Sequence, residues 1–369
     1  MEDLTSERHN CLRYSCAEGC GIFQRVEMPL KICLRRLKLC HFHSIWIFAS
    51  FASFLAQGCT RTNSIENYKL LGHTITSQVE KDIWSCFQLC KSNVKCQSIN
   101  YNAEKSICEL NNRTKNGNEV RFVSSDGNVY VDNPFRSRIG EEEDFPGLSC
   151  KDIKDSQENS PNGEYWIAPS NSDAPFTVFC DMQTNGGGWT LIAQTVVKNT
   201  TSLTPMVREK NYRMISNYSK GIIRIDVSAI FKLKQLTGFT QIRFYCHKKT
   251  TGRTLHIMTK NDINGHSVVK YFIEDPNIQP RACASFERLP GDNAYLSVNC
   301  SKWGNDGISG ECEKWGSFKN KGSFRIYNDP IFWEGKYYVN IKPSVLACDD
   351  LYSSSAPLSV GDTWQVFVR

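Results

Sequence analysis

The stretch FTVFCDMQTNGGGWT, residues 176–190, carries the strongest fold signal in this chain of 369 residues. Phe176, Val178 and Cys180 occupy every second position, which predicts a β-strand with one buried face. Three consecutive glycines, residues 186–188, permit positive φ angles and close backbone approach. They predict a tight bend that delivers Trp189 into a hydrophobic core, where a second strand begins.

Residues upstream extend this pattern. Cys150 and the run NGEYWI, residues 162–167, precede the strand and the glycine bend. Together with Cys180 and Trp189 they resemble the start of a fibrinogen C-terminal-like domain. The resemblance implies a disulfide between Cys150 and Cys180, and closing that loop would stabilise the fold by roughly 3–4 kcal/mol. We therefore expect a β-rich, fibrinogen-like domain over residues 150–369.

The fibrinogen-like pattern diverges after about residue 200. Fibrinogen-like domains usually carry an acidic calcium loop, then Asn-Cys, then paired tryptophans. This chain has Asp292-Asn293, Asn299-Cys300 and a single Trp303 instead. The family's calcium site and acetyl-group pocket are therefore not carried over, and we assign no metal and no cofactor. Calcium stays an open alternative with Asp292 and Asn293 as its candidate ligands, and a surface turn is the competing interpretation.

The tail of the chain, GDTWQVFVR, residues 361–369, ends in a strand pattern. Trp364, Val366 and Val368 fall on one face of that strand. We expect it to close the sheet of the second domain.

The first part of the chain, residues 59–131, has the pattern of a mixed helix and strand domain. Ile83, Cys86, Phe87 and Cys90 recur at spacings of three and four, so they share one face of a helix predicted over residues 80–91. Short strands are expected at Gln97–Tyr101, Ile107–Leu110, Val120–Val123 and Val129–Val131, with turns at Asn116-Gly117 and Asp126-Gly127.

The cysteines of this part follow the pattern Cys86-x3-Cys90-x5-Cys96-x-Ser-x-Asn-Tyr, which ends at Cys108-Glu-Leu. This pattern resembles the PAN/apple domain, in which a helix is stapled to a small antiparallel sheet. The resemblance implies the bridges Cys86–Cys108 and Cys90–Cys96. A metal site is disfavoured because the paired CxxC knuckles of zinc sites are missing. The predicted fold class is thus α+β, a disulfide-stapled PAN/apple domain followed by a divergent fibrinogen-like domain.

Residues 132–149, DNPFRSRIGEEEDFPGLS, lie between the two expected domains. They contain two prolines, two glycines and the acidic run from Glu141 to Asp144, without apolar periodicity. We interpret them as a solvated linker whose like charges keep it extended. A cation-binding patch is the competing interpretation of the acidic run.

The N-terminal residues 1–58 have the features of a secretory leader. The apolar run Ile45–Ala56 follows a basic stretch and precedes the small residue Gly58, which predicts cleavage after this glycine. Met28 begins a conventional basic segment, so the functional start is expected there. An uncleaved anchor is the alternative, but a spanning helix needs roughly 20 apolar residues.

Removal of the leader leaves twelve of the 17 cysteines, an even number that suits a fully bridged secreted protein. Cys59 has no partner within the first domain, so it pairs elsewhere in the chain, links two chains or stays free. The pairings of the remaining cysteines stay open: Cys246, Cys283, Cys300, Cys312 and Cys348.

Four Asn-x-Ser/Thr sequons agree with secretion: Asn112, Asn199, Asn217 and Asn299. Asn199 lies in a polar run and is the strongest candidate for glycosylation, whereas Asn299 precedes a cysteine that we expect to be bridged. Without residues 1–58 the chain has 37 Lys and Arg against 33 Asp and Glu, a formal charge of +4. This charge is too small and too scattered for a nucleic-acid partner.

The sequence contains no GxSxG elbow, HExxH helix, P-loop or dinucleotide fingerprint, so we expect no enzyme and name no catalytic residue. Two functions remain. The first is a secreted extracellular matrix protein that binds protein or glycan partners, with a disulfide-linked oligomer through Cys59 as one form of assembly. The alternative is a lectin-like protein that binds glycans or acetylated groups through the fibrinogen-like domain.

The order of PAN-like segment, divergent fibrinogen-like segment and terminal GDTWQVFVR resembles secreted cnidarian proteins. Among these are skeletal organic matrix proteins of stony corals. The resemblance implies an extracellular location in the organic matrix of a biomineral. The weak charge of the mature chain suggests that it organises other matrix components and does not nucleate carbonate directly.

Overall fold

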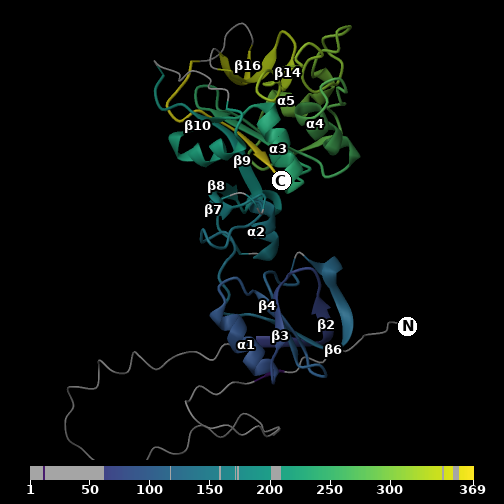
Figure 1. Cartoon of the computed structure of the whole chain (residues 1–369). Helices are drawn as coiled ribbons and strands as arrows, with labels where there is room; N and C mark the ends of the chain where they lie inside the picture. Colours follow the sequence, from purple (N-terminus) through teal and green to yellow (C-terminus); the bar gives the residue numbers. More distant parts are fainter. Residues whose placement is uncertain are drawn as a thin grey trace, which may run out of the picture. The chain divides into compact units, whose positions relative to one another are not determined.

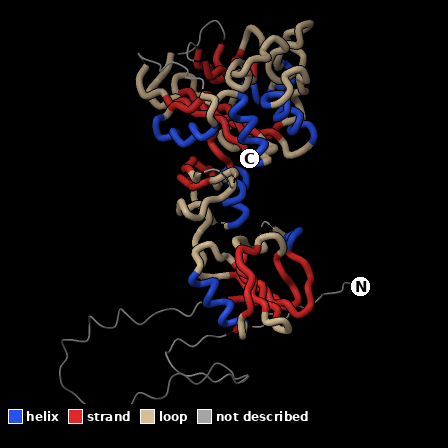
Figure 2. The backbone as a smooth tube through the Cα atoms, in the orientation of Figure 1, coloured by secondary structure: helices blue, strands red, loops and turns tan. Residues whose placement is uncertain are grey.

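The computed structural model describes residues 11–12, 62–116, 118–157, 159–170, 172, 174–200, 209–342, 345–351 and 357–369. The chain divides into two compact units (Figures 1 and 2). Unit 1 includes the described residues up to Thr114 and the segment Val120–Arg136, and unit 2 contains Lys115–Glu119 and Ser137–Arg369. Apart from Cys11–Leu12, the expected leader lies outside the described residues, and so do its apolar run Ile45–Ala56 and Cys59.

Unit 1 is an antiparallel sheet with one helix. Its strands are β1 (Cys11–Leu12), β2 (Thr62–Leu70), β3 (Thr74–Val79), β4 (Ser98–Asn102), β5 (Ile107–Asn111) and β6 (Phe122–Asp132), in the spatial order β1-β2-β6-β4-β5-β3. The 3₁₀ turn η1 (Glu119–Arg121) leads into β6. The sequence patterns predicted β4 and β5, but they gave no signal for β2 and β3.

Helix α1 (Ile83–Ser92) packs its cysteine face on this sheet. The Asp82 side chain caps the helix by accepting the Ser85 N–H at 2.7 Å, and this geometry lowers the pKa of Asp82. Cys86 and Cys90 are fully buried and are bridged to Cys108 on β5 and to Cys96. These are the two pairs that the PAN resemblance implies.

The expected turn at Asp126-Gly127 is wrong, because β6 continues through it as one strand of eleven residues. The register between β2 and β6 shifts at this point, so the extra residues form a bulge. Gly127 has φ +71°, and its N–H donates to the side chain of Asn67, itself at φ +59°. A bulge and a hairpin turn can both require a glycine with positive φ, so the sequence alone does not distinguish them. The pairing of β6 with β2 shows that this one is a bulge.

The expected solvated linker over 132–149 is also wrong for most of its length. Ile139 and Phe145 are buried in the core of unit 2, and Gly147 forms a parallel bridge with Ile167. The Gly140 carbonyl accepts the Trp166 N–H at 2.7 Å. The acidic run 141–144 does remain exposed. Two apolar side chains anchored on either side of four solvated charges carry no periodicity that a sequence pattern could detect.

Unit 2 contains an eight-stranded antiparallel sheet. Its members are β7 (Gly163–Ile167), β8 (Phe176–Asp181), β9 (Trp189–Val196), β10 (Ile222–Arg224), β11 (Ile242–Lys248), β12 (Arg253–Thr259), β13 (Phe286–Arg288) and β17 (Thr363–Val368). The spatial order is β13-β12-β11-β17-β9-β8-β7, and β10 pairs with β9. The tail strand β17 therefore lies in the middle of the sheet and is hydrogen-bonded to both β11 and β9. The sequence pattern instead predicts a strand that closes the sheet.

The glycine bend has the expected conformation. Gly186, Gly187 and Gly188 have φ values of +82°, +72° and +76° and follow the short 3₁₀ turn η2 (Thr184–Gly186). A Cβ atom at Gly187 would lie 2.0 Å from the Met182 carbonyl oxygen, so no other residue fits there. Trp189 then enters the core with no exposed surface.

Five helical segments cover the sheet: α2 (Cys150–Ser156), η3 (Tyr212–Lys220), α3 (Val227–Thr237), α4 (Ile263–Ile273) and α5 (Tyr295–Val298), and the 3₁₀ turn η4 (Cys300–Lys302) follows α5. A second sheet is formed by β14 (Ile331–Trp333), β15 (Tyr337–Lys342) and β16 (Val345–Leu351). Figure 1 shows β14 and β16 at the opposite end of unit 2 from α2, β7 and β8.

Covalent and ionic contacts hold the small sheet to the large one. Cys246 on β11 is bridged to Cys348 on β16. Lys248, at the end of β11, donates to Asp350 on β16 at 2.5 Å, with side-chain exposures of 0% and 1%. These contacts join residues about 100 positions apart and fix β16 against the face of the main sheet.

A buried carboxylate also caps helix α5. The Asp349 carboxylate accepts the backbone N–H groups of Tyr295 and Leu296 at 2.7 and 2.9 Å, and Arg253 lies 3.7 Å away. Burial, opposed by these donors, raises the pKa of Asp349 to about 6. The folded state therefore holds a proton on this group between pH 4 and 6 that the unfolded chain releases.

We expect the free energy of unfolding to decrease as pH rises from about 4 to about 6, by up to about 3 kcal/mol from this group. The replacement Asp349→Asn, which cannot titrate, should remove that part of the slope. Burial also raises the pKa of Asp329, so the difference between the wild type and the variant is the informative quantity. Urea unfolding at several pH values measures it, and parallel pH profiles for the two proteins would contradict the prediction.

Candidate functional site

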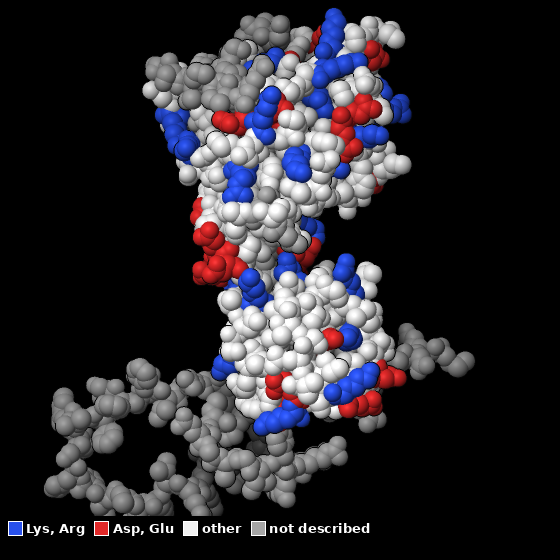
Figure 3. All heavy atoms as spheres, in the orientation of Figure 1, with Lys and Arg blue, Asp and Glu red and all other residues white. Residues whose placement is uncertain are grey.

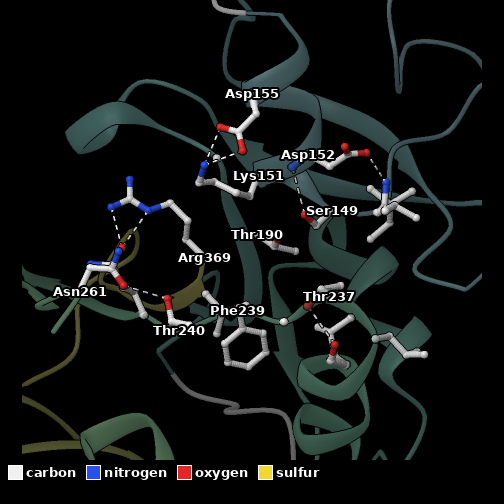
Figure 4. Close-up of a pocket in the computed structure, with 18 residues that line it drawn as sticks. Ser149, Lys151, Asp152, Asp155, Thr190, Thr237, Phe239, Thr240, Asn261 and Arg369 are labelled. Atoms are coloured by element: carbon white, nitrogen blue, oxygen red, sulfur yellow. Dashed lines mark hydrogen bonds and ion pairs between the residues drawn. The ribbon is translucent and has the colours of Figure 1, made fainter. Parts of the chain in front are cut away.

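A pocket of about 340 Å³ lies in unit 2 between α2, the end of α3 and the end of β17 (Figure 4). This volume is at the lower end of the range found for small-molecule sites. Its wall is formed by residues from six parts of the sequence: Leu148, Ser149, Lys151, Asp152, Asp155, Ile167, Gly188, Thr190, Leu233, Leu236, Thr237, Gly238, Phe239, Thr240, Gln241, Asn261, Val368 and Arg369. We call it the α2–α3 pocket.

Local sequence features position both helices that form the α2–α3 pocket. Ser149 caps α2 by accepting the Asp152 N–H at 3.2 Å, and the bridge Cys150–Cys180 fixes the first turn of α2 to β8. Helix α3 ends at Gly238, which adopts a left-handed conformation and donates its N–H to the Lys234 carbonyl. That ending turns the chain so that Phe239 and Thr240 complete the wall.

Charged and polar groups lie on opposite sides of the pocket. Lys151 binds Asp155 at 2.5 Å on one side, and Thr240 donates to Asn261 at 3.1 Å on the other. Figure 4 shows the Arg369 side chain between these two groups. The Asn261 side-chain oxygen is also 2.9 Å from His266 Nε2. Since that oxygen already has two partners, the amide nitrogen of Asn261 is the part that can donate to a ligand.

Arg369 forms a rigid part of the wall. Its guanidinium binds the Gln241 side chain and the carbonyls of Asn185 and Gly187 at 2.6–3.2 Å, and it lies 4.3 Å over the ring of Trp189. Burial lowers the pKa of Arg369, and Asp155 opposes that shift. Because these partners occupy the guanidinium, Arg369 shapes the pocket and supports Trp189 more than it offers a free cation.

The remaining wall is apolar and comes from leucine, isoleucine, phenylalanine and valine side chains, including Leu148, Leu236 and Phe239. Leu148 is half exposed at the rim. An apolar wall with a few convergent polar groups is typical of a site that binds the body of a ligand and orients it by hydrogen bonds. Three hydroxyls of the pocket have structural partners: Thr237 donates to Leu233, Thr240 donates to Asn261, and Ser149 caps α2.

Both calcium candidates have protein partners. The two Asp292 oxygens accept the His256 N–H, the Arg288 guanidinium and the Ser297 hydroxyl. Asn293 holds the Thr254 N–H at 2.7 Å. These residues tie the segment before α5 to β12, as the surface-turn interpretation expects. No group of three His, Cys, Asp or Glu residues in the described part of the chain could hold a metal ion.

The structure assigns partners to the cysteines whose pairing the sequence left open. Cys246 is bridged to Cys348 and Cys283 to Cys300. Cys312 is a half-buried free thiol, and burial raises its pKa. The described residues contain five bridges, and none of them includes Cys312.

The four sequon asparagines differ in exposure. Asn199 is exposed, whereas Asn112, Asn217 and Asn299 are half buried. The Asn299 amide donates to the Tyr295 carbonyl at 2.8 Å and precedes the bridged Cys300. A glycan needs the amide nitrogen to be accessible, so glycosylation at Asn199 remains the strongest of the four predictions.

Sequence reasoning missed the α2–α3 pocket. Its polar residues come from separate segments: Lys151 and Asp155 from α2, then Thr240, Asn261 and Arg369. Arg369 ends the quoted stretch GDTWQVFVR, but that stretch predicted only a strand. The only local signals were the glycine bend, which contributes Gly188, and the N-terminal end of the fibrinogen-like pattern. Nothing in the chain before folding indicates that residues about 200 positions apart face one cavity.

Two domain families match this chain. The PAN domain matches residues 59–135, and the C-terminal globular domain of fibrinogen beta and gamma chains matches residues 147–203. The chain thus contains a PAN domain followed by a β-rich, fibrinogen-like region in a mixed helix and sheet fold. The fibrinogen match ends where the sequence pattern diverges.

Individual proteins are similar to this chain either over a short segment or at low sequence identity. Mouse angiopoietin-4 is 54% identical over 43 residues, which are 12% of this chain and 8% of that protein. The fibrinogen-like globe domains of human ANGPTL2 and ANGPTL6 are each 13% identical over 61% of this chain, covering 99% and 95% of those chains with TM-scores of 0.29 and 0.27.

These domain types are typical of extracellular protein interactions and are generally non-enzymatic. Within the described residues, no helix has the length and apolar character needed to cross a bilayer. On the face drawn in Figure 3, positive and negative side chains are interspersed over both units.

Proposed function

We propose that this chain is a secreted, non-enzymatic extracellular matrix protein that holds protein or glycan partners through its two modules. The biological setting that we propose is the organic matrix of a biomineral, such as a coral skeleton. That setting is supported by the resemblance of the module order and of the terminal GDTWQVFVR to secreted cnidarian matrix proteins.

The observation that carries the proposal is the disulfide framework. Five bridges join helices and strands within the two units, and each unit has its own buried core. Bridges of this kind form and persist in oxidising compartments. Two separately stapled modules on one chain suit a protein that contacts several partners.

Expression of the full chain in a secreting eukaryotic cell tests this proposal. We expect the protein in the medium, beginning at Cys59 and carrying a glycan at Asn199, and non-reducing peptide mapping should recover the five bridges. Antibodies against it should detect it in the protein fraction released by demineralising skeleton. Protein that accumulates in the cytosol with titratable thiols would contradict secretion, and absence from that fraction would contradict the matrix setting.

A lectin-like function is the second candidate, and the α2–α3 pocket supports it. The pocket offers the Asn261 amide and the Lys151–Asp155 pair around an apolar wall, which suits a sugar ring with its polar edge and less polar face. Binding to a glycan array that free sugar competes away would favour this function over matrix assembly.

The replacement Leu148→Asp tests whether the α2–α3 pocket holds the ligand. Leu148 is 43% exposed at its rim, so the variant should fold while a carboxylate replaces apolar contact. We expect binding to fall by about tenfold or more, which corresponds to about 1.4 kcal/mol. Leu351→Asp is the matched control, since Leu351 is 48% exposed on β16 and outside the pocket. Equal affinities for the two variants would place the ligand elsewhere.

A further inference from the structure

Strand β3 lies at the end of the sheet of unit 1. Within the described residues it pairs with β5 only, so one edge of its backbone has no neighbouring strand. Every side chain from Thr74 to Val79 is exposed. The N–H and C=O groups that alternate along such an edge can accept another strand.

The composition of β3 makes this edge unusual. Its sequence, TITSQV, contains no charged residue and no proline, and three of its six residues are threonine or isoleucine, which favour strands. Exposed edges in soluble proteins are usually protected by lysine, proline, a bulge, a covering loop or very short length. Of these devices β3 has a register irregularity between Thr74 and Thr76, and its remaining residues pair regularly with β5. In β3 the two apolar side chains Ile75 and Val79 are exposed instead.

We propose that β3 is a docking edge for the β3 strand of a second copy of this chain. Two identical edges can pair antiparallel about a two-fold axis, so each copy supplies the same residues and the assembly closes as a dimer. Self-pairing would place like charges opposite each other in a charged strand, and β3 carries none. Backbone hydrogen bonds would supply most of the affinity, as in other strand additions.

This pairing is independent of the α2–α3 pocket and of a disulfide through Cys59. A strand of six residues buries little surface, so we expect a weak, reversible dimer that extends the unit 1 sheet across two chains. A matrix protein with such an edge could assemble without a covalent link.

Sedimentation equilibrium of the full secreted chain tests the proposal. The sample is the fraction that runs as a monomer on a non-reducing gel, which removes covalent dimers. We expect concentration-dependent dimerisation in the register that places Ser77 on the two-fold axis, opposite Ser77 of the second copy. The variant Ser77→Lys should weaken it by about tenfold or more because two lysines then face each other. Ser124→Lys is the matched control, since Ser124 is exposed on the interior strand β6 of the same sheet. Its dissociation constant should stay unchanged.

A charge-reversal experiment completes the test. Mixing Ser77→Lys with Ser77→Glu should restore dimerisation as a heterodimer, which a folding defect in either variant would not allow. Three results would overturn the proposal: a wild-type chain that stays monomeric up to about 1 mM, a Ser77→Lys variant that dimerises like the wild type, or equal weakening by Ser124→Lys. Association that needs a different protein would also overturn it.

Discussion

Replacing Cys246 and Cys348 together by alanine should lower the free energy of unfolding of unit 2 by about 4–5 kcal/mol. The bridge closes a loop of 102 residues, the longest in the described disulfide set, so its loss returns the most conformational freedom to the unfolded chain. Both sulfur atoms are buried, and the removed atoms would leave space in the core. Because small domains are stable by only about 5–15 kcal/mol, unit 2 would come close to unfolding at ambient temperature.

The bridge Cys283–Cys300 provides the matched comparison. It closes a loop of only 17 residues, and the loop lengths alone make its contribution smaller by about 1.6 kcal/mol. Urea unfolding followed by tryptophan fluorescence measures both variants, since most of the eight tryptophans lie in unit 2. If Cys246→Ala/Cys348→Ala cannot be secreted, its secreted yield relative to the other double variant gives the same ranking. Equal losses would contradict the prediction.

The variant Asp350→Ala should cost about 3–5 kcal/mol, because it leaves the Lys248 ammonium buried without its counter-ion. The side chains of this pair are 0% and 1% exposed, and the other bond of Lys248 is to the Leu346 carbonyl at 3.4 Å. Replacing both partners by apolar residues, Lys248→Met with Asp350→Leu, should recover most of the loss, because no unpaired charge then remains.

The exposed pair Lys151–Asp155 is the control, because it joins the same two residue types at the protein surface. It has the same 2.5 Å separation, with side-chain exposures of 51% and 38%. Asp155→Ala should therefore cost less than about 1 kcal/mol. Denaturation of the four proteins in one buffer measures the difference. A small cost for Asp350→Ala, or a double variant no more stable than this single one, would show that the pair is not held in a dry environment.

The bridge Cys246–Cys348 and the ion pair Lys248–Asp350 explain why the position of the small sheet cannot be predicted from sequence. Cys348 and Asp350 lie two positions apart on β16 and meet Cys246 and Lys248, two positions apart on β11. The sequence leaves the partners of these cysteines open, because several different pairings are compatible with an even number of cysteines. Pairing follows from which strands become neighbours in the fold, and that neighbourhood joins residues 102 positions apart.

Local patterns worked where the cause was local. The helix with Cys86 and Cys90 on one face, the strand at Phe176–Asp181 and the bend before Trp189 all depend on residues within a few positions. The errors had a different origin. Asp126-Gly127 became a bulge because β2 pairs across it, and residues 137–149 fold into unit 2 because Ile139 and Phe145 fit a core built elsewhere in the chain.

The sequence by itself determined the two module types, the helix and strand periodicities and the glycine bend, because each of these follows from spacing along a few turns or one strand. Tertiary structure alone decided the central position of β17, the cysteine pairs of the second half, the α2–α3 pocket and the place of β3 at the end of the described sheet. The physical reason is that these features depend on contacts between segments far apart in the chain. Burial and backbone pairing select such contacts only when the whole sheet is assembled.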